Sequence, residues 1–129
     1  MSFFDELDSV FSEPPRTSVS HVPMFVGESE HGHRYRYNAA TYFLYGAKFD
    51  VHVQLWAYPI TRSTKASVWV DDHDRERRIG LNWTKQWAAA SPELAWRDFK
   101  IRLAWRARYA QQEVDRVTAI KAVVEADGA

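Results

Sequence analysis

The stretch AWRDFKIRLAWRARYA, residues 95–110, indicates a helix and sets the interpretation of the whole chain. Just before it, Ser91, Pro92 and Glu93 supply an N-cap, a proline for the first turn and an early acid, which together are typical of a helix start. No proline interrupts the chain after them. We therefore expect a C-terminal helix of about 35 residues, or roughly 50 Å at 1.5 Å per residue.

A helix of this length does not fit inside a domain of this size. A compact domain of 129 residues has a diameter of roughly 36 Å. The helix must therefore overhang the domain, rest on another chain, or break. If the helix breaks, Gln111 and Gln112 are a suitable place, although no proline or glycine enforces a break there.

The apolar residues of the predicted helix form two stripes rather than one. At about 100° per residue, a first stripe gathers on one face. It consists of Trp96, Phe99, Leu103, Ala107, Ala110, Val114 and Val117. We expect this stripe to lie on a sheet, and its alanines to allow a close approach.

The second stripe is turned by about 160° from the first. It contains Leu94, Ile101, Trp105 and Tyr109. Trp, Tyr and Arg are enriched where binding energy concentrates at interfaces, because each combines a large contact area with a polar group. The predicted partner-binding residues are Arg97, Ile101, Arg102, Trp105, Arg108 and Tyr109. The alternative is that a terminal helix or the strands cover this stripe, or that arginine stems pack along its rings.

Residues 20–83 alternate apolar and polar side chains with period two, which is typical of strands. The clearest strand is residues 47–60, and residues 65–70 and 77–83 are expected to form a hairpin through DDHDRE. A strand over residues 21–27 would be confined to a sheet edge by Pro23. The pattern predicts an antiparallel sheet of about four strands.

The N-terminal residues 1–13 predict a short amphipathic helix with one apolar face. That face consists of Phe3, Phe4, Leu7, Val10 and Phe11. A proline-containing linker over residues 14–19 then leads to the sheet, and residues 84–126 form the predicted helical region, with a shorter helix expected before Ser91. The expected fold is a single α+β domain, residues 1–129, with the long C-terminal helix packed on one sheet face.

Composition restricts the cellular setting. Seventeen basic residues balance seventeen acidic ones, so the chain has no overall field that attracts nucleic acid. It contains no cysteine, which excludes disulfides and thiol chemistry and fits a reducing compartment. The N-terminus lacks the pattern of a signal peptide, and no apolar run has the length of a membrane span. We expect a soluble, cytoplasmic protein with no membrane partner.

Motifs for catalysis, cofactors and metals are missing from the sequence. It has no nucleophile elbow, phosphate-binding glycine loop or dinucleotide fingerprint. The histidines, among them His31 and His33, do not repeat with the spacing of zinc ligands. In the acidic run DDHDRE, a calcium loop counted from Asp72 would need glycine at its sixth position, which is Arg77. We therefore expect no cofactor, no metal and no catalytic residues, although a small enzyme with an unrecognised site is a further alternative.

Nucleic acid is the main alternative partner. The strand HRYRYN interleaves arginine with tyrosine, and aromatic platforms beside cations are what single-strand binding requires. The residues proposed for this role are Arg34, Tyr35, Arg36, Tyr37 and Trp56. In an ordinary half-buried strand, the same alternation would turn the tyrosines inward and the arginines outward.

The sequence favours a small non-catalytic binding protein that acts on a protein or nucleoprotein partner as an adaptor, inhibitor or regulator. Stand-alone, cysteine-free domains of this kind are common among phage and mobile-element accessory proteins. The aromatic and arginine residues of the C-terminal helix would form the contact, with the aromatics supplying most of the affinity and the charges steering approach. The same face could instead join two copies of the chain in a homodimer.

Overall fold

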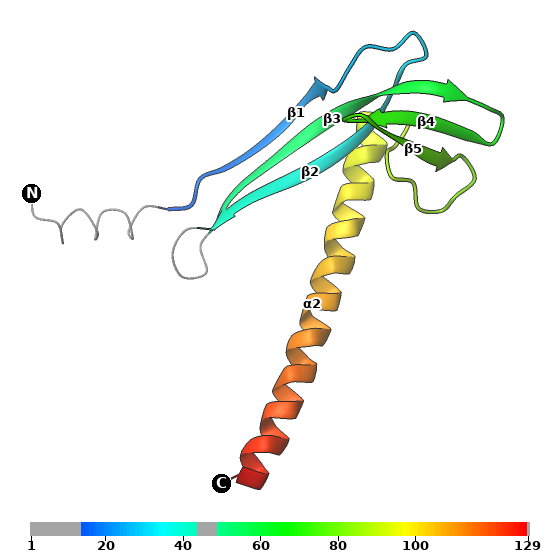
Figure 1. The fold of residues 1–129 in the computed structure, drawn as a ribbon. Coiled ribbons are helices and arrows are strands. Elements are labelled where there is room, and N and C mark those ends of the chain that lie inside the picture. The colour runs from blue at the N-terminus through cyan, green and yellow to red at the C-terminus, as the bar shows by residue number, and fades with distance from the viewer. Residues whose placement is uncertain (1–13, 44–48, 129) are drawn as a thin grey trace, which may run out of the picture.

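The computed structural model describes residues 14–43 and 49–128, which form an α+β domain with a long projecting helix (Figure 1). Its elements in chain order are β1 (Thr17–Phe25), β2 (His33–Phe43), β3 (Phe49–Ser63), β4 (Ser67–Asp72), β5 (Arg75–Gly80) and α2 (Pro92–Gly128). The helix expected over residues 1–13 lies outside the described residues.

The longest strand, β3, organises the sheet. Its first part lies between β1, which is parallel to it, and β2, which is antiparallel to it from His33–Pro59 to Phe43–Phe49. Its last part pairs with β4, which in turn pairs with β5. The described residues thus form a mixed sheet of five strands, and the expected antiparallel sheet of about four strands was partly wrong. The parallel pairing arises because β1 and β2 run in opposite directions on opposite sides of β3.

The prediction that Pro23 confines its strand to an edge is confirmed. β1 is an edge strand, and its register with β3 shifts between Ser20 and Met24, around the residue that cannot donate a backbone hydrogen bond. The freed carbonyl of Val22 accepts a hydrogen bond from Gln54 Nε2 at 2.8 Å. The sheet also begins at Thr17, inside the segment that was expected to be a linker.

The hairpin predicted through DDHDRE is confirmed as β4–β5. Its two turn residues, His73 and Asp74, have φ values of 51° and 70°. Positive φ at both central residues is the backbone of a type I′ turn, whose twist matches that of the flanking strands. The backbone N–H of Asp74 also donates to Asp71 Oδ1 at 3.0 Å.

The start of α2 follows the predicted N-cap. The backbone N–H of Leu94 donates to Ser91 Oγ at 3.2 Å, and the N–H of Ala95 donates to the Ser91 carbonyl at 2.9 Å. Two backbone hydrogen bonds of 2.7 and 2.8 Å between Ala89 and Tyr35 attach the preceding segment to β2. Residues 84–91 are irregular, so the short helix expected before Ser91 does not form.

The helix α2 is continuous over 37 residues, so it has no break at Gln111 and Gln112. It leaves the sheet after its first turns and projects away from the domain (Figure 1). Only Ala95 and Phe99 are buried along its whole length. The expectation that its first apolar stripe lies on the sheet is therefore wrong beyond Phe99, because the helix axis diverges from the strands.

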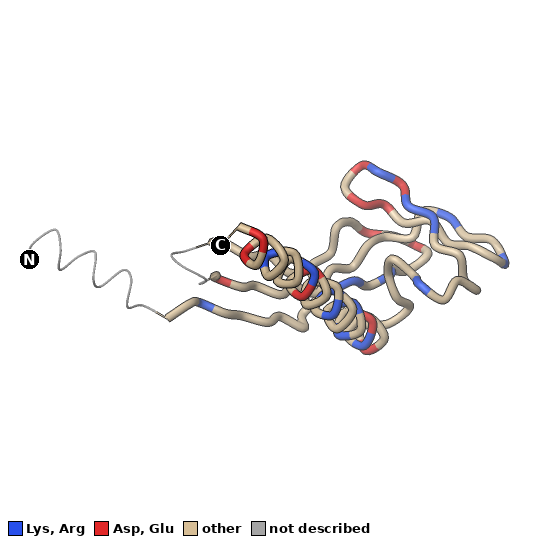
Figure 2. Tube along the Cα trace, turned by 90° about the horizontal axis from the view of Figure 1, so that it is seen from below, with Lys and Arg blue, Asp and Glu red and all other residues tan. Residues whose placement is uncertain are grey.

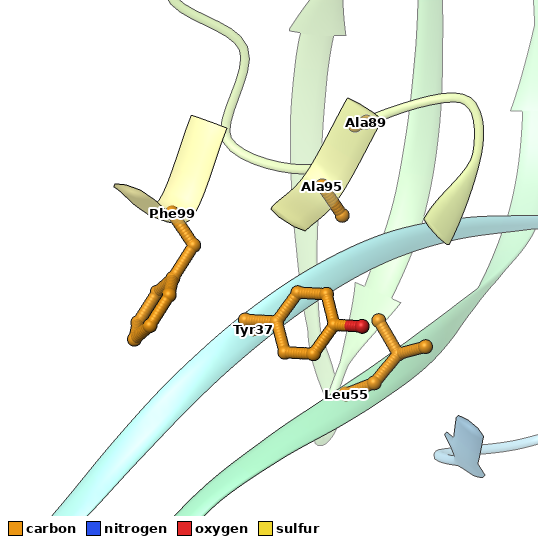
Figure 3. Packing of buried hydrophobic residues seen from close by; sticks show 5 residues of the cluster. All are labelled: Tyr37, Leu55, Ala89, Ala95 and Phe99. Atoms are coloured by element: carbon orange, nitrogen blue, oxygen red, sulfur yellow. The ribbon is translucent and has the colours of Figure 1, made fainter. Parts of the chain in front are cut away.

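The core lies in two clusters on opposite faces of the sheet. One cluster joins α2 to the sheet, and Figure 3 shows how its members meet between α2 and the strands β2 and β3. They are Tyr37, Leu55, Ala89, Ala95 and Phe99. The other packs β4 and β5 against the end of β3 and the segment before α2. Its members are Tyr58, Val68, Val70, Ile79 and Ala88.

Candidate interaction surfaces

The most exposed part of the described chain is the projecting portion of α2, residues 103–128, which we call the arm. Every residue of the arm is exposed. Its large apolar side chains are Leu103, Trp105, Tyr109, Val114, Val117, Ile120, Val123 and Val124. Large exposed apolar patches are a common feature of interaction sites.

One side of α2 carries the residues that the sequence predicts for partner binding. Trp105 and Tyr109 are 48% and 61% exposed, and their rings stack at 6.0 Å between centroids with an angle of 28°. The guanidinium of Arg108 lies 5.3 Å from the centroid of the Trp105 ring. We call Arg97, Ile101, Trp105, Arg108 and Tyr109 the aromatic face. They form a preassembled apolar platform with positive charge at its rim.

The sixth predicted residue, Arg102, has a different role. Its Nη2 donates to the Tyr37 carbonyl of β2 at 2.9 Å, and its guanidinium lies 5.6 Å from the Phe99 ring centroid. Burial lowers its pKa from the usual value. Arg102 therefore ties α2 to the sheet at the point where the helix departs. Arg97 remains at the surface, beside Asp98 at 3.4 Å.

A second apolar line runs along the other side of the arm. It consists of Leu103, Ala107, Ala110, Val114, Val117 and Val124, and we call it the apolar seam. All of these side chains are exposed. They continue the stripe that begins at Trp96 and Phe99, where the sheet covers it. The seam thus starts where the contact with the sheet ends.

Both basic and acidic residues lie along α2 (Figure 2), and their proportions differ between its two halves. Residues 97–108 hold five basic side chains and one acidic side chain, whereas residues 109–128 hold four acidic and two basic ones. The root of the helix is therefore positive and its tip is negative. This polarity is a property of the arm as a whole, because most of these side chains are exposed.

The face of the sheet opposite α2 holds an open pocket of about 540 Å³. Aromatic, polar and charged side chains from β2, β3 and the segments beside them line it. Those that give it its chemical character are Arg36, Trp56, Tyr58, Asp72, His73 and Trp87. The ring of Trp87 is contacted by two guanidiniums, of Arg36 at 4.9 Å and of Arg77 at 4.5 Å from its centroid.

Arg36 keeps its positive charge in this pocket. Its Nη1 donates to the Trp87 carbonyl at 2.6 Å and its Nε donates to Asn38 Oδ1 at 3.1 Å. Burial, together with the nearby charge of Arg102, lowers the pKa of Arg36 to about 10. The group is thus protonated at neutral pH. Arg77 differs, because Asp72 Oδ2 accepts a hydrogen bond from its Nε at 2.6 Å and balances its charge.

The residues proposed for nucleic-acid binding do not share one surface. Tyr35 and Tyr37 face α2, where Tyr37 is buried, whereas Arg36 and Trp56 line the pocket on the opposite face. Arg34 is only 8% exposed, and burial lowers its pKa. The interleaved strand therefore does not present a continuous row of aromatic and basic groups.

Sequence reasoning missed several pocket residues. Trp87 and His73 come from an irregular segment and a turn, and neither belongs to a pattern that predicts a site. Only the pairing of strands β3–β5 and the bridge at Ala89 bring these residues to Arg36. The abundance of Trp and Arg was the one feature of the sequence that could have indicated such a pocket.

Within residues 14–43 and 49–128, no group of three or more His, Asp or Glu side chains is placed to hold a metal ion. No helix in the same ranges is both long and apolar enough to cross a membrane. Comparisons with protein-family models, curated proteins and solved structures find no match to this chain.

Proposed function

We propose that this chain is a small non-catalytic binding protein that docks on a protein or nucleoprotein partner through the aromatic face of α2. The observation that carries the proposal is the exposed stack of Trp105 and Tyr109, with Arg108 above Trp105. These rings are not part of the described core, and the helix that carries them projects beyond the sheet. An adaptor, inhibitor or regulator would use such a surface.

The arrangement suits tight docking for physical reasons. Two rigid rings already stacked in the free protein lose little conformational entropy when a partner covers them. Arginines at the edge can steer an acidic partner surface and remain hydrated at the rim. Trp and Tyr at the centre of a contact are the residues whose truncation most often weakens binding.

The test compares the tagged wild-type protein with a Trp105→Ala/Tyr109→Ala variant in host extract, with and without nuclease. The proposal predicts a specific partner that the wild type retains and the variant loses; capture that survives nuclease indicates a protein partner, and capture that nuclease removes indicates a nucleoprotein. A Val114→Ala/Val117→Ala variant, altered on the other side of the arm, is the matched control and should retain that partner. Equal retention by all three proteins would contradict the proposal.

A second candidate is the binding of a single-stranded nucleic acid, favoured by the aromatic pocket around Arg36. Trp56 and Trp87 are half-buried aromatic rings beside a charged guanidinium, the combination on which bases stack and phosphates pair. Fluorescence anisotropy with a labelled oligonucleotide tests it at several salt concentrations. Trp56→Ala should weaken binding by about tenfold, since stacking contributes roughly 1–3 kcal/mol per base, whereas Trp69→Ala, outside the pocket, should not. Binding that is absent or insensitive to Trp56 would exclude this candidate.

A further inference from the structure

The apolar seam has the spacing of a coiled-coil helix. From Leu103 to Val124 the seven positions along this line alternate at intervals of four and three residues. They are Leu103, Ala107, Ala110, Val114, Val117, Lys121 and Val124, so Lys121 is the one polar member. Heptad spacing keeps one face of a helix against a partner helix over a long distance. The line is about 32 Å long at 1.5 Å per residue.

The described chain supplies no cover for this line. The sheet packs on Trp96 and Phe99, which belong to the same stripe, and no later residue of the stripe is buried. Arg102, which lies off the stripe, donates a hydrogen bond to the sheet. Leu103, Val114 and Val117 are 42%, 57% and 50% exposed. In globular proteins, long helices are stabilised mainly by packing of an apolar face, and no part of residues 14–43 or 49–128 packs on the arm in this way.

The charge along α2 favours one partner helix for the seam, a second copy of α2, and one orientation of that copy. The root of α2, residues 97–108, is basic, and its tip, residues 109–128, is acidic. The charges of one arm therefore complement those of a second arm that runs in the opposite direction. A second copy placed parallel would set basic root against basic root. A second copy placed antiparallel sets each root against the other's tip, which is favourable at both ends.

We propose that two copies of this chain pair through their apolar seams as an antiparallel two-helix coiled coil with two-fold symmetry. Such a contact is self-complementary and closes with two copies. The small side chains of Ala107 and Ala110 let the helices approach closely. The two sheets then lie at opposite ends of the paired arms, and the aromatic face points away from the seam.

The heptad positions also select a register. Setting Val114 against Val117 of the second copy brings Ala107 against its Val124 and places Arg106 beside its Asp127. Moving the second copy by one heptad towards the sheet sets Glu113 against its own counterpart. The same shift drives the second helix into the region that the sheet already covers at Trp96 and Phe99. The first register is therefore favoured.

This inference is independent of the proposed function, because the two sides of the arm are used separately. Sedimentation equilibrium of the full chain over a range of concentrations measures the self-association. A Val114→Glu/Val117→Glu variant places charge in the seam at exposed positions, outside the contact with the sheet. Trp105→Ala/Tyr109→Ala is the control on the opposite side.

The wild type should sediment as a dimer, and the seam variant should raise the dissociation constant by at least about tenfold, as expected for losing central apolar contacts. The aromatic-face variant should dimerise like the wild type. A wild type that stays monomeric throughout, or a seam variant that dimerises equally well, would overturn the proposal. Dissociation caused only by the aromatic-face variant would also overturn it.

Orientation is tested by cross-linking, for which the cysteine-free chain is a clean background. An Ala107→Cys protein is mixed with a Val124→Cys protein under mild oxidation. The antiparallel register predicts a disulfide between the two different proteins and little cross-linking of either protein with itself. A parallel pair would give the reverse result, with each protein cross-linked to itself, and would overturn the antiparallel arrangement.

Discussion

Tyr37 is the residue that joins the helix to the sheet. Its ring lies 4.9 Å from the Trp96 centroid and 5.9 Å from that of Phe99, and its hydroxyl is hydrogen-bonded to His21 Nδ1 at 2.6 Å. Its carbonyl accepts the hydrogen bond from Arg102. Residues from β1, β2 and α2 thus meet on one buried side chain.

Replacing Tyr37 with phenylalanine should lower the free energy of unfolding by about 1 kcal/mol, the usual net contribution of one hydrogen bond. The ring and its packing remain, so only the bond to His21 is lost. Urea denaturation measures the effect, with Tyr42→Phe as a control because Tyr42 is exposed. Equal loss in both variants would show that the buried hydroxyl contributes nothing specific.

Tyr58 should make the protein sensitive to alkali. Burial raises the pKa of its phenol above the ordinary value, and nearby Asp72 acts in the same direction. The folded state therefore holds this proton more tightly than the unfolded state does. The free energy of unfolding should be unaffected by Tyr58 below pH ~10 and fall as the pH rises beyond it.

Denaturation at a series of pH values checks this expectation. A Tyr58→Phe variant should lose less stability above pH ~10 than the wild type does, because its unfolded state has one fewer phenol to ionise. Tyr42→Phe again serves as the exposed control. An identical alkaline slope in wild type and Tyr58→Phe would contradict the assigned shift in pKa.

The helix α2 consists of two parts, first turns that pack on the sheet and an exposed arm. Its first turns are held by the Ser91 cap, by Phe99 in the core and by Arg102 on β2. The arm beyond them has no buried residue. The contacts that hold α2 in the fold therefore lie in its first turns.

Paired substitutions at the two ends of α2 test this division. Phe99→Ala should destabilise the protein by about 3–5 kcal/mol, the usual effect of emptying a buried aromatic site. Val123→Ala, at a position that is 70% exposed, should change stability by no more than about 0.5 kcal/mol. Thermal and urea unfolding measure both. Similar losses in the two variants would mean that the arm belongs to the core.

Local patterns predicted the elements better than their arrangement. The cap at Ser91, the edge position of Pro23 and the β4–β5 hairpin follow from neighbouring residues, and all three are confirmed. Alternation in HRYRYN would turn the tyrosines inward and the arginines outward. Tyr37 is indeed buried against α2, whereas Arg34 is only 8% exposed. These features depend on short-range geometry that a single sequence contains.

The direction of β1 and the departure of α2 from the sheet could not be predicted. Alternation defines which side chains share a face, but it is the same for a parallel and an antiparallel neighbour. The stripe from Trp96 to Val117 has one periodicity, although only its first part meets the sheet. The spacing does not indicate which part of the stripe the sheet covers. The pocket residues were missed because the spacing along the chain also does not indicate which distant segments come together.

At the scale of the whole molecule, a small mixed sheet supports a projecting helix (Figure 1). The aromatic face and the apolar seam run along opposite sides of that helix, and charge changes sign along its length. A molecule built in this way can contact a second copy on one side and a different partner on the other. Trp105 and Tyr109 belong to the exposed surface of this helix rather than to the core.

The most direct test of this claim is the free energy of unfolding of the Trp105→Ala/Tyr109→Ala variant, measured by urea denaturation beside the wild type. Both rings are about half exposed, and alanine favours a helix, so we predict a difference of no more than about 0.5 kcal/mol. A loss above about 2 kcal/mol, typical of truncating buried side chains, would contradict the account and assign both rings to the core.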